Sequence, residues 1–392
     1  MQIGFCLYKY FPYGGIQRDL MKLARECLKR GHEVRVYVGL WNAPRPAEQI
    51  ELVLVPAKAV TNHKRYERFA SWVGEHLREH PVDLLVGMNK MPGLDVYYAG
   101  DSCYAEKART QRGALYRMLP RYRHFARFER AVFGSGSATE ILTISDNEVP
   151  VFREHYATPL ERFHALPPGI DRDRAATPDA PRQRAEFRRE FAIGDAERLL
   201  LFVGSGFIKK GLDRALLAVR ALPKEVAAST RLFVVGNDNA EPFRRMAARL
   251  GISSRVQFFS GRDDIPRFLH AADALLLPAY DETAGMVIIE AMIAGVPALV
   301  TANCGYAGYL AEANAGLLAP LPFDQAAFNG QLLELLTSPE RERWRANGRA
   351  LAANPEIYRL AEVAVDYLER FAAARQGSRL GAATPAGEVG NG

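Results

Sequence analysis

The sequence predicts an α/β protein with two doubly wound, Rossmann-like domains that face each other across a central cleft. Its 392 residues exceed one ordinary hydrophobic core and suit two domains. Short β-rich runs alternate with amphipathic helical stretches in both halves of the chain, which is typical of parallel sheets covered on both faces. A polar segment with several prolines lies between the two series and indicates the boundary.

The first half of the chain begins with the pattern strand, glycine loop and helix. A β-rich run at 2–8 leads to Gly14 and Gly15, after which apolar residues recur at helical spacing as far as Leu28. Further strands are predicted at 34–40, 51–55, 84–88, 96–99 and 141–145, with helical stretches among them. We therefore assign residues 1–168 to an N-terminal Rossmann-like domain.

The second half repeats this architecture after the polar segment 169–190, which we predict to be an interdomain linker. Strands are predicted at 199–203, 232–235, 256–259, 274–277 and 298–301, so residues 191–355 form a second Rossmann-like domain. An amphipathic helix is predicted at 356–375. Residues 376–392 are rich in Gly, Ala and Ser and too poor in apolar side chains to pack, which predicts a disordered tail.

Composition and charge narrow the class of protein. With 48% hydrophobic and 24% charged residues the chain is globular, and its net charge of +6 favours an anionic partner such as nucleotide phosphate, nucleic acid or a membrane surface. The four cysteines form no CxxC pair, so we read no zinc or redox motif and expect reduced cytosolic thiols. The N-terminus is not a signal peptide. The apolar stretch 284–302 contains Glu290 and Gly295, which favours a buried helix and strand over a membrane span.

Two motifs at strand ends indicate contact with phosphate. Gly14 and Gly15 lie between the first strand and the first helix, where bare N–H groups can meet a phosphate or a sugar; a plain tight turn is the alternative. The pair is not GxGxxG, which disfavours a dehydrogenase. Lys209 and Lys210 follow a predicted strand, and their two ammonium groups can neutralise a diphosphate leaving group. An exposed basic turn is the alternative for the lysine pair.

The sharpest signal is a pair of carboxylates, Glu282 and Glu290, eight positions apart. A helix can begin at Gly285, so that the N–H groups of residues 285–287 are free to bind phosphate. Glu290 would be buried among apolar neighbours without a partner, which is costly unless it binds something. One carboxylate can then meet a sugar and the other a ribose.

These motifs, together with longer runs, resemble the retaining GT-B glycosyltransferases of family 4, and within them the enzymes of the lipopolysaccharide core. The family is marked by Glu, seven residues and Glu, which is Glu282 to Glu290 in this chain. The other matching runs are 8–15, 17–19, 89–97, 103–107, 166–170 and 304–307, so that the likeness covers nearly all of residues 1–375. The resemblance implies a GT-B architecture whose C-terminal helix crosses back to the N-terminal, acceptor-side domain.

The resemblance also implies an activity. It is transfer of a hexose, usually glucose, from a UDP-sugar to a heptose of the lipopolysaccharide inner core, with the anomeric configuration retained. The UDP-sugar is a substrate, and neither a cofactor nor a metal is expected. The donor-binding residues carried over are Gly15, Asp19, Lys209, Lys210, Arg262, Glu282, Gly285, Met286, Val287 and Glu290.

Individual roles follow from the same resemblance. Glu290 would bind the ribose and Glu282 the sugar hydroxyls, while Lys209 and Lys210 hold the diphosphate. The uracil would lie near Arg262. Glu282 and Lys210 are also assigned to catalysis.

Two positions depart from the family pattern. Asp101, the third residue assigned to catalysis, stands where many relatives have a His, and Lys209 stands where relatives often have an Arg. Lysine lacks the bidentate guanidinium fork, so the diphosphate geometry can differ. An alternative for Asp101 is that it caps the following helix.

Retention of configuration has two candidate mechanisms. A double displacement needs a carboxylate beside the anomeric carbon, and the motifs offer Asp19 and Asp101. The resemblance favours a front-side replacement in which the leaving phosphate helps to deprotonate the acceptor. Asp171 and Asp173 form a DxD pattern but have no further ligand nearby in sequence, so we do not expect a metal.

A basic and aromatic segment lies between Tyr104 and Phe133. It holds eight basic residues against two acidic ones, interleaved with apolar side chains. This composition suits the interface of an anionic membrane, and we assign membrane binding to Arg109, Arg112, Arg117, Arg121, Arg123 and Arg127. An ordinary solvated helix is the alternative; nucleic acid is not expected, because no aromatic nucleic-acid module is readable.

The sequence thus predicts a cytoplasmic enzyme bound peripherally to the cytosolic face of the inner membrane. Lys90 and Arg174 are hypotheses for contacts with the acceptor or the linker. A UDP-N-acetylhexosamine transferase or an epimerase of the same fold would carry the same carboxylate pair. A catalytically inert membrane-surface scaffold is a third possibility, but such a protein has no need to bury Glu290.

Overall fold

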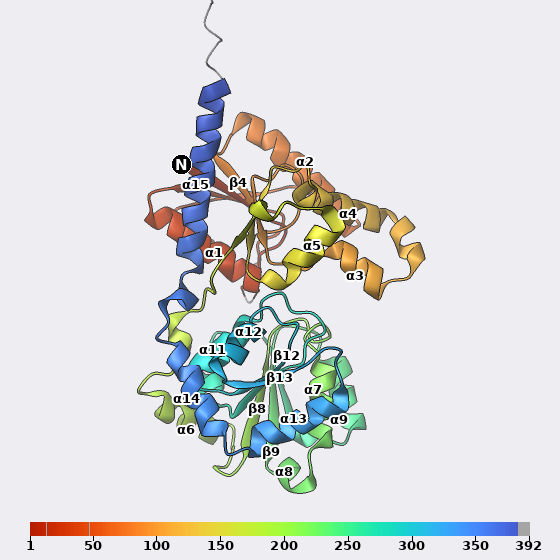
Figure 1. Cartoon of the computed structure of the whole chain (residues 1–392), viewed down its shortest axis with the longest axis vertical. Helices are drawn as coiled ribbons and strands as arrows, with labels where there is room; N and C mark the ends of the chain where they lie inside the picture. Colours follow the sequence, from red (N-terminus) through yellow and green to blue (C-terminus); the bar gives the residue numbers. More distant parts are fainter. Residues whose placement is uncertain (13, 47, 383–392) are drawn as a thin grey trace, which may run out of the picture.

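A computed structural model of the chain describes residues 1–12, 14–46 and 48–382. It contains two parallel sheets, each covered by helices on both faces, stacked one above the other (Figure 1). The predicted pair of doubly wound domains is confirmed.

The sheet of the first domain has seven strands in the order β3-β2-β1-β4-β5-β6-β7. The strands are β1 (Gln2–Leu7), β2 (Glu33–Val38), β3 (Ile50–Leu54), β4 (Leu84–Gly87), β5 (Val96–Ala99), β6 (Glu140–Thr143) and β7 (Phe163–Ala165). The helices are α1 (Gly15–Lys29), α2 (Asn62–Glu79), α3 (Tyr104–Gln111), α4 (Pro120–Phe133) and α5 (Val149–Tyr156). The strand order reverses between β1 and β4, which is where ligands bind in such folds.

The sheet of the second domain has six strands in the order β10-β9-β8-β11-β12-β13. They are β8 (Arg198–Val203), β9 (Thr230–Val235), β10 (Val256–Phe259), β11 (Ala274–Leu277), β12 (Ala298–Thr301) and β13 (Gly316–Ala319). The helices are α6 (Ala180–Glu190), α7 (Leu212–Ala221), α8 (Lys224–Ala228), α9 (Glu241–Arg249), α10 (Ile265–Ala271), α11 (Met286–Ile293), α12 (Ala307–Ala313), α13 (Gln325–Thr337) and α14 (Arg341–Leu351). Its order reverses between β8 and β11, so this domain has a switch point of its own.

The last helix, α15 (Leu360–Ala382), returns to the first domain after a short 3-10 turn and lies beside α1 (Figure 1). Its Val365 and Leu368 are fully buried in the first-domain core. Arg30, at the end of α1, reaches Asp366 at 2.6 Å, and His32 reaches Glu369 at 2.9 Å. The crossing implied by the family resemblance is therefore present.

Helix α15 is longer than the predicted helix 356–375. It begins at Leu360 and continues to Ala382, so residues 376–382 are helical where the sequence predicted disorder. The reason is that elongation of an established helix is easy, and Arg379, Leu380 and Ala382 are good helix formers that offset Gly377 and Gly381. Residues 383–392 of the predicted tail lie outside the described residues.

The predicted linker 169–190 also needs correction, because its second half is helix α6 of the second domain. Phe187 of α6 is fully buried in the second-domain core. Arg184 and Arg188 bind the carboxylate of Asp273 at 2.7 and 3.3 Å. The segment was predicted to be a linker because it is rich in charged residues and Phe187 is its one buried aromatic residue. The partner of its arginines, Asp273, lies far along the chain and could not be recognised in the sequence.

The connection before α6 and the one after α14 run side by side. Ile170 N–H donates to Ile357 O at 3.0 Å, and Leu360 N–H donates to Pro168 O at 3.2 Å. The two domains are thus joined by two hydrogen-bonded crossings. Among the described residues, none of the helices combines the length and the apolar character that crossing a bilayer requires.

We predict that Leu368→Ala lowers the free energy of unfolding by about 2–5 kcal/mol, because a fully buried leucine leaves a cavity where α15 meets the first-domain core. Urea unfolding followed by circular dichroism and by tryptophan fluorescence would measure it. Arg370→Ala, an exposed change on the same helix, is the control. Equal stability of the two variants would contradict the packing of α15.

Candidate functional site

A cleft of about 480 Å³ lies between the two domains, at the carboxyl ends of both sheets. Residues of the first domain reach it from the loop before α1 and from the loop after β5. Residues of the second domain reach it from the loops after β8 and β11 and from the start of α11. All ten residues predicted to bind the donor line this cleft, as do Asp101 and Arg174.

The lysine pair lies in the tight loop between β8 and α7. Gly211, which ends the loop, has φ +74° and its backbone approaches Pro278 so closely that a Cβ would lie 2.0 Å from the carbonyl oxygen. The turn therefore requires glycine at this position. Lys210 Nζ is ion-paired with the carboxylate of Glu282, and Lys209 Nζ lies 3.6 Å from Asp281 Oδ2.

Glu282 and Glu290 come from different local structures. Glu282 lies in the loop after β11, and Gly285, with φ +83°, turns the chain into α11 at Met286. The helix therefore starts after Glu282, and the two carboxylates do not share one helix face. Burial raises the pKa of Glu282, but the Lys210 and Lys209 ammonium groups outweigh it and hold that pKa below its ordinary value.

Glu290 is 5% exposed within a helix whose other residues from Val287 to Ile293 are all buried. The sequence predicted no partner, but the fold supplies two cations at ion-pair distance. Arg18 of α1 has Nη1 3.8 Å from Glu290 Oε1, and Arg174 has Nε 3.9 Å from the same oxygen. Arg174 stands on the crossing between the domains, so Glu290 is contacted from two parts of the chain outside its own helix.

Sequence reasoning quoted Arg18 as part of a matching run but gave it no role. Its position one residue before Asp19, in the first turn of α1, was the available signal. Side-chain nitrogens of Arg18 and Arg174 are buried without a hydrogen-bond partner within the described residues. Such groups favour an acceptor-rich ligand beside them.

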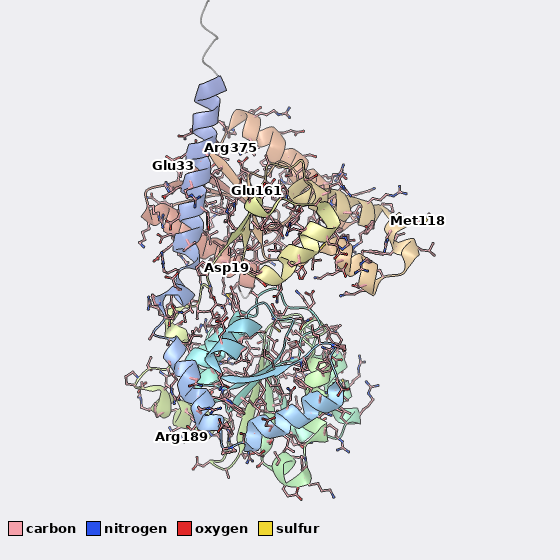
Figure 2. All side chains as sticks on the ribbon, in the orientation of Figure 1. Asp19, Glu33, Met118, Glu161, Arg189 and Arg375 are labelled. Carbon is pink, nitrogen blue, oxygen red and sulfur yellow. The ribbon has the colours of Figure 1, made fainter. Side chains whose placement is uncertain are left out.

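Asp19 faces the cleft from the first turns of α1 (Figure 2). It is 2% exposed, and its Oδ2 accepts a hydrogen bond from Tyr98 Oη at 2.7 Å. Burial raises the pKa of Asp19, and the Tyr98 hydrogen bond with nearby cations offsets this only in part. The hydrogen bond from Tyr98 occupies one carboxylate oxygen of this buried side chain, which disfavours Asp19 as the nucleophile of a double displacement.

Asp101 is exposed in the loop after β5 and lines the cleft. The alternative that it caps the next helix is wrong. Cys103 is the N-cap of α3, and the backbone N–H groups of Tyr104 and Ala105 donate to Glu129 at 2.8 and 2.9 Å. The cap position is therefore already served by a carboxylate from α4.

Lys90 does not reach the cleft, which corrects the hypothesis that it contacts the acceptor. Its ammonium group is buried 2.6 Å from Glu129 and donates to Ser102 O at 2.8 Å. Burial lowers the pKa of Lys90, but attraction to Glu129 and Asp101 outweighs it and raises that pKa above its ordinary value. The lysine therefore supports the loop that carries Asp101.

The DxD pattern does not gather into a metal site. Asp171 pairs with Lys22 at 2.8 Å, and Asp173 lies 3.5 Å from Arg174. Among the residues that the structure describes, no three His, Cys, Asp or Glu side chains are grouped to hold an ion.

The basic segment projects from the side of the first domain as α3, the 3-10 helix η1 (Ala114–Met118) and α4, with Met118 at its tip (Figure 2). Leu115, Met118 and Leu119 are 78, 64 and 48% exposed. All six arginines assigned to membrane binding are exposed. Two of them are ion-paired, Arg109 with Glu106 of the same helix and Arg127 with Glu67 of α2.

Comparison with known proteins follows the division into two domains. Residues 13–174 match the model of Glycosyltransferase Family 4, and residues 183–351 match the model of Glycosyl transferases group 1. Lipopolysaccharide glucosyltransferase WaaG of Escherichia coli (strain K12) is 48% identical over 369 residues, 94% of this chain and 98% of that protein. A D-inositol 3-phosphate glycosyltransferase of Stackebrandtia nassauensis is 30% identical over 54% of this chain and 50% of that protein.

Solved structures of glycosyltransferases share the fold of this chain. The crystal structure of WaaG has a TM-score of 0.90 at 48% identity and covers 93% of this chain and 99% of that one. Anabaena Alr3699/HepE in complex with UDP and glucose has a TM-score of 0.74 at 17% identity, covers 94% of this chain and 100% of that one, and shows the fold alone. Both halves of the chain and its whole architecture thus agree, and the chain belongs to the family 4 glycosyltransferases of the GT-B fold.

Proposed function

We propose that this glycosyltransferase moves a hexose, with glucose as the expected sugar, from a UDP-sugar to a heptose of the lipopolysaccharide inner core and retains the anomeric configuration. The main support is that Lys209, Lys210, the start of α11 and the carboxylates of Glu282 and Glu290 all line one cleft. This set provides cations and N–H groups for a diphosphate and acceptors for the hydroxyls of a ribose and a sugar. The 48% identity to a lipopolysaccharide glucosyltransferase supports the substrate class.

The diphosphate is proposed to lie against Lys209, Lys210 and the N–H groups of residues 285–287. Negative charge grows on the leaving phosphate as the glycosidic bond breaks, and these groups stabilise it where it appears. Lys210 leaves its ion pair with Glu282 in this state, so that Glu282 becomes free to accept hydrogen bonds from the sugar.

The nucleoside is proposed to bind on the other side of the diphosphate. Glu290 accepts hydrogen bonds from the ribose while Arg18 and Arg174 hold its charge in place. Arg262 lines the cleft near the proposed uracil position and is itself fixed by Asp264 at 2.6 Å. A uridine nucleotide is thus held by residues from both domains.

Retention is proposed to proceed by front-side replacement. The acceptor hydroxyl gives its proton to an oxygen of the leaving phosphate and forms its bond to the anomeric carbon on the face that the phosphate leaves. Asp19 is buried and accepts a hydrogen bond from Tyr98, and Asp101 lies exposed in its loop, so neither is arranged as an activated nucleophile. The protein then contributes by positioning the reactants and by stabilising charge.

The basic segment is proposed to hold the enzyme on the anionic cytosolic face of the inner membrane, where a lipid-anchored acceptor is presented. Leu115, Met118 and Leu119 are exposed in this segment, and the exposed Arg112, Arg117 and Arg121 lie within three residues of one of them in the sequence. Each basic residue near such a surface contributes about 1 kcal/mol. The insertion of apolar side chains adds to this attraction.

The donor is tested by calorimetric titration with UDP, UDP-glucose, UDP-galactose, UDP-N-acetylglucosamine and UDP-N-acetylgalactosamine, with and without Mg²⁺. We expect UDP and UDP-glucose to bind without metal. Preference for an N-acetylated donor would replace glucose by a hexosamine and leave the site intact. Failure of every nucleotide to bind would refute the proposed donor class.

The two carboxylates are predicted to have separable effects. Glu290→Gln removes a charge-assisted hydrogen bond to the ribose and weakens UDP binding about tenfold or more. Glu282→Ala removes a contact to the transferred sugar and lowers kcat about a hundredfold while UDP affinity changes little. Titration and steady-state kinetics would measure both, with the exposed Asp195→Asn as control. Wild-type kinetics in both variants would overturn the assignment.

Membrane binding is predicted to depend on the arginines of the basic segment. Replacing Arg117, Arg121 and Arg123 by Glu should lower the binding constant for anionic vesicles, measured by sedimentation, by about a hundredfold or more. Added salt should lower the binding constant of the wild type as well. The matched control replaces Arg220, Arg245 and Arg249, exposed arginines of the second domain, by Glu. Undiminished sedimentation of the first variant would remove the membrane proposal.

A further inference from the structure

Asp281, the residue before Glu282, has contacts to both domains although no motif marks it. Its side chain is 18% exposed, and its Oδ2 lies 3.6 Å from Lys209 Nζ, in its own domain. The same oxygen lies 2.6 Å from Lys107 Nζ, on α3 of the first domain. The other oxygen, Oδ1, accepts a hydrogen bond from Ser102 Oγ at 2.7 Å, also from the first domain.

Neighbouring contacts cross between the domains at the same place. Ser102 Oγ lies 3.2 Å from Thr283 Oγ1, and Asn147 Nδ2 donates to Cys304 O at 3.5 Å. Burial alone raises the pKa of Asp281, but the Lys209 and Lys107 ammonium groups outweigh it and hold that pKa low, so the carboxylate is charged at neutral pH. The ionised carboxylate of Asp281 therefore lies between a lysine of each domain and links the two domains.

Further hydrogen bonds hold the first-domain side of this contact. Ser102 has its carbonyl bound by Lys90, and Lys90 is paired with the fully buried Glu129 of α4. Glu129 also binds the first N–H groups of α3, the helix that carries Lys107. Asp281 therefore connects the donor loop with the base of the basic segment and with the loop that carries Asp101.

We propose that Asp281 is a positioning residue that closes the two domains over the donor. It holds Ser102 and Lys107 of the first domain, and it gives up Lys209 to the diphosphate when the UDP-sugar binds. Closure brings the Asp101 loop against the second domain at the site of transfer. This inference rests on the proposed UDP-sugar donor for its second step, while the closure itself is a property of the ligand-free chain.

Such a carboxylate has two effects of opposite sign. It competes with the diphosphate for Lys209 and repels it, so its removal should tighten the binding of UDP. It also maintains the closed arrangement, so its removal should slow transfer. General damage to the fold would weaken both, which makes the combination diagnostic.

The test compares Asp281→Asn, Asp281→Glu and Lys107→Met in the full chain. For Asp281→Asn we expect UDP to bind about threefold more tightly and kcat to fall about tenfold. Lys107→Met should lower kcat by a similar factor without tightening UDP, and the double variant should be no slower than either single one. Asp281→Glu, which keeps the charge, should recover most of the turnover.

The controls are Asp195→Asn and Lys224→Met, which remove the same charges from exposed side chains of the second domain. Small-angle scattering of the ligand-free proteins should show a larger radius of gyration for Asp281→Asn and Lys107→Met than for the wild type and these controls. An unchanged radius, or UDP binding and turnover that fall together in Asp281→Asn, would overturn the proposal. A wild type that binds no UDP would refute the donor instead, and the scattering comparison would still decide whether Asp281 closes the domains.

Discussion

The burial of one carboxylate, Glu290, is the constraint on which the arrangement of the chain depends. It lies in α11 among apolar side chains, where an unpaired charge would be strongly destabilising. The second domain does not supply the nearby cations. Arg18 comes from the first domain and Arg174 from the crossing between the domains, so the charge of a single residue requires three separately folded segments to meet.

In the ligand-free chain other charged residues of the cleft are paired with an opposite charge as well. Lys210 rests on Glu282, Lys209 on Asp281, and Arg262 on Asp264, so each cation that is proposed to meet the donor already has an acidic neighbour. A donor therefore exchanges one set of ion pairs for another, and the net gain is smaller than the number of contacts suggests. In the ligand-free chain these charges are therefore paired with one another.

The sequence was informative where a pattern has local causes. Strands, the Gly285 turn into α11 and the alternation of elements all follow from neighbours in the chain, and the residues of the donor motifs meet at the strand ends because parallel sheets place them there. Features that depend on partners far along the chain could not be predicted from the sequence. Lys90 was proposed to contact the acceptor because its partner Glu129, thirty-nine residues away, cannot be predicted from periodicity. The charges of α6 suggested a linker for the same reason, since their partner Asp273 lies in another element.

The return of α15 to the first domain has a consequence for the order in which the protein is assembled. Leu360, Ala364, Val365 and Leu368 complete the same core as Leu20 and Val36, but they leave the ribosome more than three hundred residues later. The second domain, whose strands lie between residues 198 and 319, is complete before then. Domains generally fold in order of synthesis. Here the first domain gains its last layer only after the second has been made, so the N-terminal core is the last to be finished.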